Sequence, residues 1–101
     1  MLYSPNPDAP AYDEVQRKQI LLDHVAWARA QFECGNAILA GAIRNHPQLN
    51  GMGMFALGSP ERVNALMAED PAIIAGVDTY QLVEFVTRAG AIKRLRESPA
   101  A

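Results

Sequence analysis

The chain has 101 residues, of which half are hydrophobic and a fifth are charged, a composition typical of one globular domain rather than a disordered segment. Nine Lys and Arg residues against eleven Asp and Glu residues give a net charge of −2, which argues against nucleic acid as a partner. One cysteine excludes an internal disulfide, and the absence of a signal-peptide pattern and of a long apolar run favours a cytoplasmic protein that makes no membrane span.

The first part of the chain predicts a short strand followed by a long helix. Residues 1–4 favour a strand, which a series of prolines then interrupts. Asp13 is a suitable N-cap for a helix that continues to about Cys34, where Gly35 ends it. Apolar residues recur along one face of this helix, with His24 at the border of that face: they are Leu21, Val25, Ala28 and Phe32.

The middle of the chain predicts two strands and a second helix. The apolar runs 37–43 and 52–57 favour strands, and the residues between them form a polar loop. Ser59 followed by Pro60 is a serine cap with proline at the first helical position, so a helix is expected to run to about Glu69.

The end of the chain predicts one more strand and a basic tail. Residues 80–86 favour the strand, and residues 91–96 favour a short helix within the tail formed by 88–101. A length of 101 residues is close to the common size of a domain, so residues 1–101 are expected to form a single domain, and the sequence contains no internal repeat.

The order strand, helix, strand, strand, helix, strand predicts an α+β fold of the ferredoxin-like type, a four-stranded antiparallel sheet with both helices on one face. In that fold the helices run antiparallel, which brings His24 toward Asp70. The strands over 37–43 and 52–57 are apolar on both faces, and the helices can cover only one of them. We therefore expect a homodimer that packs sheet against sheet.

Asp70 and His24 form the candidate catalytic pair. Pro71 disfavours helical conformation at Asp70, so the predicted helix ends there and leaves a carboxylate at the negative end of the helix dipole. A more distant partner is expected for it, and a carboxylate on one nitrogen of His24 would fix the tautomer while the other nitrogen takes a proton. The structural alternatives are a histidine at the border of the core and an aspartate bonded only to local backbone.

Arg17 and Trp27 are candidates for ligand binding on the first helix. The arginine would bind a phenolate or carboxylate, and the tryptophan would wall an aromatic ligand; a solvated charge and a core or interface tryptophan are the alternatives. The two histidines and the cysteine lack the spacing of a metal site, and no glycine-rich nucleotide loop is present, so neither a metal nor a cofactor is expected. Cys34 is expected to be a buried residue at the helix end.

Four segments resemble the YCII-related family of small dimeric α+β barrel proteins. They are His24 in the first helix, the strand 37–41, the glycine-bounded strand 51–54, and Asp70-Pro71 followed by Ala75-Gly76-Val77. The resemblance covers about residues 15–86, the expected core of the domain. The segment Leu21-Leu22-Asp23 stands where members carry Arg-Pro-Ala, and Ala72 where they carry an aromatic residue, which implies a reshaped pocket.

The resemblance implies that His24 and Asp70 are a catalytic dyad, and the family includes a dehydrochlorinase that acts on a chlorinated hydroxyhydroquinone. We therefore expect a cofactor-free lyase or isomerase in which His24 removes a proton from a small oxygenated aromatic or quinone-like substrate. Charge pushed into the ring would then expel a leaving group such as chloride. The alternative is a non-catalytic protein of the same fold that binds a small ligand or serves as an accessory protein.

Overall fold

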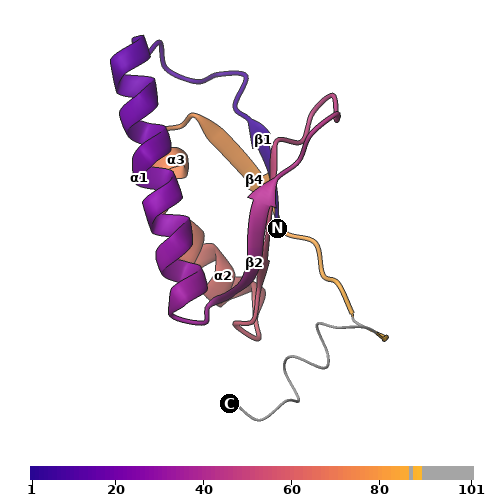
Figure 1. The fold of residues 1–101 in the computed structure, drawn as a ribbon. Helices are drawn as coiled ribbons and strands as arrows, with labels where there is room; N and C mark the ends of the chain where they lie inside the picture. The colour runs from indigo at the N-terminus through magenta and orange to yellow at the C-terminus, as the bar shows by residue number, and fades with distance from the viewer. Residues whose placement is uncertain (87, 90–101) are drawn as a thin grey trace.

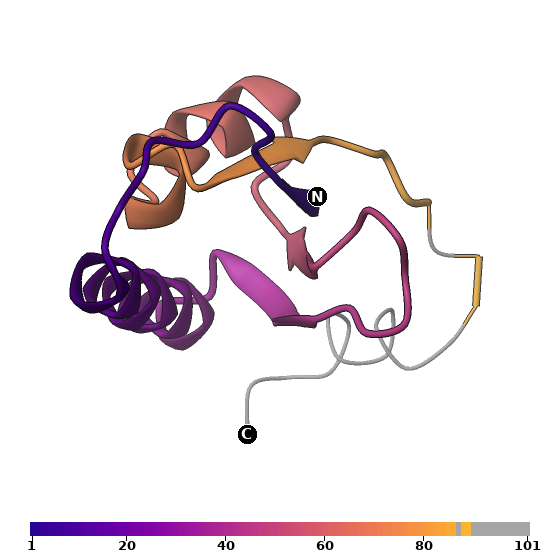
Figure 2. The same ribbon diagram turned by 90° about the horizontal axis from the view of Figure 1, so that it is seen from above.

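The computed structural model describes residues 1–86, 88 and 89, which form an α+β fold with the helices on one face of an antiparallel sheet (Figures 1 and 2). The four strands lie in the order β2-β3-β1-β4, and the architecture is compatible with a ferredoxin-like fold. The elements are β1 (Leu2–Pro5), α1 (Glu14–Glu33), β2 (Ala37–Ala42), β3 (Gly51–Phe55), α2 (Pro60–Met67), α3 (Pro71–Ile74) and β4 (Asp78–Gln81).

The ends of the two longer helices follow the capping signals in the sequence. The Asp13 side chain accepts a hydrogen bond from the backbone N–H of Gln16, and the backbone N–H of Asp13 donates to Oε1 of Gln16, which completes a capping box at the start of α1. At the start of α2 the Ser59 hydroxyl accepts from the backbone N–H of Arg62, and proline follows at the first helical position. Gly35, with a φ of 87°, takes the left-handed conformation that ends α1.

The last strand is shorter and begins earlier than the predicted strand 80–86. β4 pairs with β1 in an antiparallel register in which Asp78 lies opposite Pro5 and Gln81 opposite Leu2. Beyond Gln81 the chain runs past the start of β1, so the mostly apolar residues 82–86 have no β1 residue to pair with and form no strand. The predicted helix over 91–96 lies outside the described residues.

The sequence predicted Asp70 at the end of the second helix, but this residue lies at the start of another helix. α2 ends at Met67, and Asp70 is the N-cap of the short helix α3, where its side chain accepts from the backbone N–H of Ala72. The proline after it takes the first position of α3, where its missing N–H costs nothing. The helix dipole therefore favours this carboxylate, which removes one reason for expecting a distant partner.

Few of the described residues are fully buried, and none of them lies on α1. The buried apolar side chains are Tyr3 in β1, Ala37 in β2, Met67 in α2 and Ala72 in α3. On the apolar face expected for α1, Leu21 is 59% exposed and Phe32 is 57% exposed. In the described part of the chain, no helix is long and apolar enough to cross a membrane.

Candidate functional site

His24 and Asp70 are in direct contact, although 46 positions separate them in the sequence. Nδ1 of His24 lies 2.8 Å from Oδ1 of Asp70, where the middle of α1 passes the start of α3. The carboxylate is completely buried, whereas 20% of the histidine side chain remains exposed. With Asp70 ionised, Nδ1 carries the hydrogen of this bond, so Nε2 is left as the nitrogen that can accept a proton.

Three donors converge on the Asp70 carboxylate. The backbone N–H of Ala72 donates to Oδ1 at 3.0 Å beside the His24 bond, and the hydroxyl of Tyr3 donates to Oδ2. A buried carboxylate is stable only when such donors replace its lost water. Tyr3 is a member of the site that the sequence interpretation missed, because nothing in a four-residue strand indicates what its tyrosine reaches.

The electrostatics of the site follow from the same contacts. The hydrogen bond to Asp70 raises the pKa of His24, an effect that outweighs the opposing effect of burial, and the negative charge of Asp78 adds to it. Burial and the bond to Asp70 raise the pKa of Tyr3, so this phenol remains protonated and is a permanent donor. The site therefore favours a positive charge on His24 and a neutral Tyr3.

Two aromatic rings hold the imidazole of His24 in place. The ring of Tyr3 meets it edge to face with centroids 5.4 Å apart, and the indole of Trp27 stacks on it at 6.4 Å with an angle of 29° between the planes. Trp27 comes from the next turn of α1, at the i+3 position where helical side chains are neighbours. The sequence-predicted Trp27 therefore lies next to the predicted dyad.

A cleft of about 710 Å³ opens between α1 and the sheet, and both His24 and Trp27 line it. Four small residues form part of the sheet side of the cleft, beside larger strand residues such as Tyr3 and Phe55: they are Ala40, Ala42, Gly51 and Gly53. Apolar side chains from α1 form the opposite wall: they are Leu21, Val25, Ala28 and Phe32. A largely apolar hollow with a few charged or polar groups at its wall, here His24, Arg29 and Asp78, is the usual form of a small-molecule site.

Arg17 is not brought into this cleft. It lines a separate hollow of about 290 Å³, and its Nε donates to the backbone carbonyl of Tyr12 at 3.3 Å. Arg29 lines the larger cleft and is the arginine that shares it with His24. Its position four residues after Val25 places it beside the apolar stripe, a signal that the sequence interpretation did not use.

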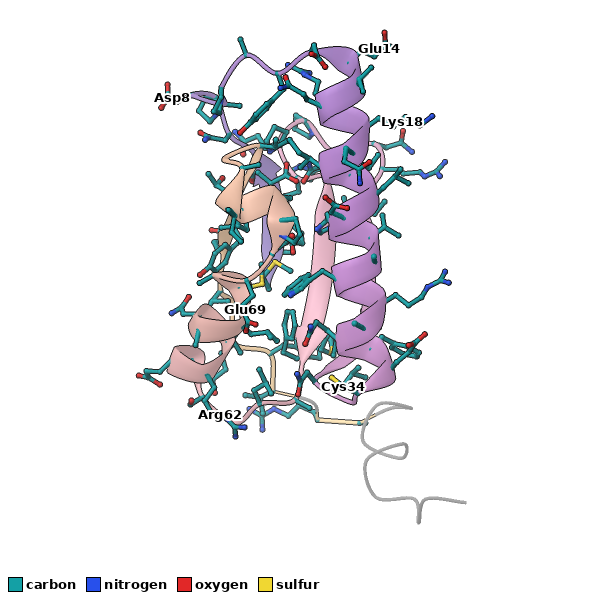
Figure 3. The ribbon with its side chains drawn as sticks, turned by 90° about the vertical axis from the view of Figure 1, so that its left-hand side faces the viewer. Asp8, Glu14, Lys18, Cys34, Arg62 and Glu69 are labelled. Carbon is teal, nitrogen blue, oxygen red and sulfur yellow. The ribbon has the colours of Figure 1, made fainter. Side chains whose placement is uncertain are left out.

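Cys34 lies at the end of α1, where Figure 3 labels it, and is exposed, so the expectation of a buried thiol was wrong. It caps the helix just before Gly35, and this end of α1 extends to the surface. Among residues 1–86, 88 and 89, no group of three or more His, Cys, Asp or Glu side chains is placed to hold a metal ion.

In comparisons with known proteins, no protein-family model, curated protein or solved structure matched this chain.

Proposed function

We propose that the chain is a dimeric, ferredoxin-like protein of the YCII-related type and acts as a cofactor-free lyase or isomerase on a small oxygenated aromatic compound. The observation that carries the proposal is the contact between the fully buried carboxylate of Asp70 and Nδ1 of His24, whose ring lines an apolar cleft. A buried carboxylate behind a partly exposed imidazole is the arrangement of an oriented general base.

In this proposal Nε2 of His24 takes a proton from a ring hydroxyl, and Asp70 stabilises the imidazolium that forms. The indole of Trp27 stacks on the imidazole and provides a flat surface beside it for an aromatic ring. Arg29, which lines the same cleft, is the cation available for a phenolate or carboxylate of the ligand, in the role first suggested for Arg17.

Dehydrochlorination of a chlorinated hydroxyhydroquinone to a hydroxyquinone is a reaction of this class. Two hydroxyl protons leave the substrate, of which His24 returns one to the carbon that bears chlorine. Loss of the second proton forms the second carbonyl and breaks the carbon–chlorine bond, so that chloride departs with the bonding electrons. The sum is the loss of HCl, and the reaction needs no oxidant or reductant.

A second copy of the chain fits the apolar face of the sheet that points away from the helices. The register pairs Leu2 with Met52 and Leu39 with Met54, and these side chains share the face opposite to Tyr3. All four are only partly covered. Sheet-to-sheet packing would remove this apolar area from water.

A non-catalytic protein that binds an anionic ligand is the second candidate, and the raised pKa of His24 favours it. A raised pKa favours the protonated imidazole, and that form attracts an anion but cannot accept a proton. In this alternative His24 and Arg29 would hold the anion in the same cleft without turnover.

A screen of chlorinated and hydroxylated hydroquinones tests the two candidates directly. Released chloride and the absorbance of the quinone product measure turnover, and calorimetry with the same compounds measures binding. Chloride release that depends on His24 supports the lyase. Binding that protects the protein from unfolding, with chloride release no faster than in buffer, supports the alternative. If no compound in the screen is bound or turned over, both candidates are contradicted.

A further inference from the structure

The Asp70 carboxylate uses both of its oxygens, and they face different partners. Oδ1 binds Nδ1 of His24 and the N–H of Ala72, whereas Oδ2 binds the hydroxyl of Tyr3, the one donor to that oxygen within the described residues. Tyr3 is 7% exposed and Asp70 is completely buried, so water does not substitute for this bond. The three-residue chain from Tyr3 through Asp70 to His24 links β1, the start of α3 and α1.

The sheet is built to admit the tyrosine ring at this position. Gly51 is the cross-strand partner of Tyr3 in β3, and a Cβ atom there would lie 3.1 Å from Cδ2 of the tyrosine. That distance is tighter than ordinary contact, so a larger residue would push the ring aside. The ring in turn meets the imidazole of His24 edge to face. One tyrosine thus touches both members of the proposed dyad.

We propose that Tyr3 is a positioning residue for this dyad: its hydroxyl holds Oδ2 so that Oδ1 faces His24, and it draws part of the carboxylate charge away from the imidazole. The inference rests on the proposed function of His24 as a base. A hydrogen bond that satisfies one oxygen weakens the pull of the carboxylate on the proton of its other partner. Tyr3 thereby limits how far the Asp70 carboxylate raises the pKa of His24.

The other ionisable groups near the imidazole set the background against which Tyr3 acts. Asp78, at the start of β4, adds a negative charge that also favours protonated His24, and Arg29 lines the same cleft from α1. Tyr80 on β4 lies directly opposite Tyr3 in the sheet, but its hydroxyl donates to Asn64 and not to Asp70. Tyr80→Phe is therefore the matched control for Tyr3→Phe.

The experiment is a ¹H–¹⁵N NMR titration of His24 in the ligand-free protein. The His24 resonance is assigned as the one that His24→Gln removes. Tyr3→Phe leaves the full carboxylate charge to His24, so the pKa of His24 is expected to rise by roughly 0.5–1 unit, whereas Tyr80→Phe leaves it unchanged. A Tyr3→Phe protein that titrates like the wild type overturns the inference.

A second variant keeps the test decisive if Tyr3→Phe does not fold. Site-specific 3-fluorotyrosine at position 3 retains the ring and makes the phenol a stronger donor, so the pKa of His24 is expected to fall. An unchanged or raised value overturns the inference. Where a substrate is turned over, the acid limb of kcat should move with this pKa while KM stays nearly constant. Failure to find a substrate would count against the proposed function alone, since the titration needs none.

Discussion

Two neighbouring stripes of α1, one that carries His24 and one that carries Leu21 and Phe32, differ in how fully their side chains are contacted. On the stripe that carries His24, the helix meets α3 and β1 through a chain of hydrogen bonds in which every polar atom of Asp70 has a partner. On the stripe that carries Leu21 and Phe32, more than half of each apolar side chain remains exposed. Within one helix of twenty residues, the polar contact has all of its hydrogen bonds, whereas the apolar side chains remain largely exposed to solvent.

The polar contacts orient the imidazole of His24, whereas the exposed apolar side chains form the surface that a ligand would cover. The bond to Asp70 and the ring of Tyr3 fix the imidazole of His24, and both contacts are made within one chain. The apolar wall of the cleft stands open, and burial of such surface in a folded protein normally requires a ligand or another protein surface. The proposed substrate would occupy the cleft, and the proposed second copy would cover the outer face of the sheet.

Substitution of His24 or Asp70 should have the largest effect, which is on kcat. His24→Ala removes the base and Asp70→Asn removes the charge that stabilises the imidazolium, so each should lower kcat by about 10²–10⁴-fold. The double variant should lose little more than His24→Ala alone, because Asp70 acts through the histidine. Initial rates of chloride release measure both effects.

His46→Asn is the control for these variants. His46 lies in a loop, where its Nδ1 accepts from the N–H groups of Gln48 and Leu49, and asparagine keeps an acceptor there. This variant should retain wild-type rates. Losses that multiply in the His24/Asp70 double variant would show that the two residues act independently.

Breaking the apolar surface of the sheet should change the assembly and leave the polar network in place. The wild type should be a dimer at micromolar concentration, and Met54→Glu should weaken it by about 100-fold or more, because the new charge would lose its water in the interface. Light scattering over a dilution series measures the shift. Val15→Glu, at a position of α1 that is 79% exposed, should leave the dimer unchanged. A monomeric wild type would refute the dimer.

A larger residue opposite Tyr3 in the sheet tests whether the packing of this ring contributes to stability. Gly51→Ala places a methyl group 3.1 Å from the tyrosine ring and should lower the free energy of unfolding by about 1–3 kcal/mol. Gly41→Ala is the matched control in β2, since a Cβ there meets nothing within 4 Å. Urea unfolding of both variants gives the comparison. Equal stabilities would mean that the strands move apart to admit the methyl group.

The pH dependence of stability should show the smallest effect. The folded-state pKa of His24 lies above its ordinary value of 6.5 because of the bond to Asp70. Its contribution to stability is therefore fully present below pH 6.5 and is lost as the pH rises through the folded-state pKa. His24→Gln should cost more stability at pH 6 than at pH 8.5, as measured by urea midpoints. A cost that grows with pH would contradict the raised pKa.

Local signals in the sequence were sufficient for the two longer helices and for the first three strands, but not for the short helix α3. Asp13, Ser59 and Gly35 mark their helix ends correctly because caps depend on neighbouring residues. The last strand was misplaced because its length depends on where its partner β1 begins, which the apolar pattern of residues 82–86 does not contain. A strand ends where its ladder ends, whatever its own propensity.

The sequence by itself determined which residue types could form a dyad, and the strand and helix order predicted that His24 and Asp70 would meet. Only the tertiary structure decided that Tyr3 completes their hydrogen bonds and that Arg17 lies outside the cleft. It also decided that Asp70 caps a new helix, since a proline after it is compatible with either a helix end or a helix start. Such contacts depend on the packing of β1, α1 and α3 together, and that geometry is absent from any one segment.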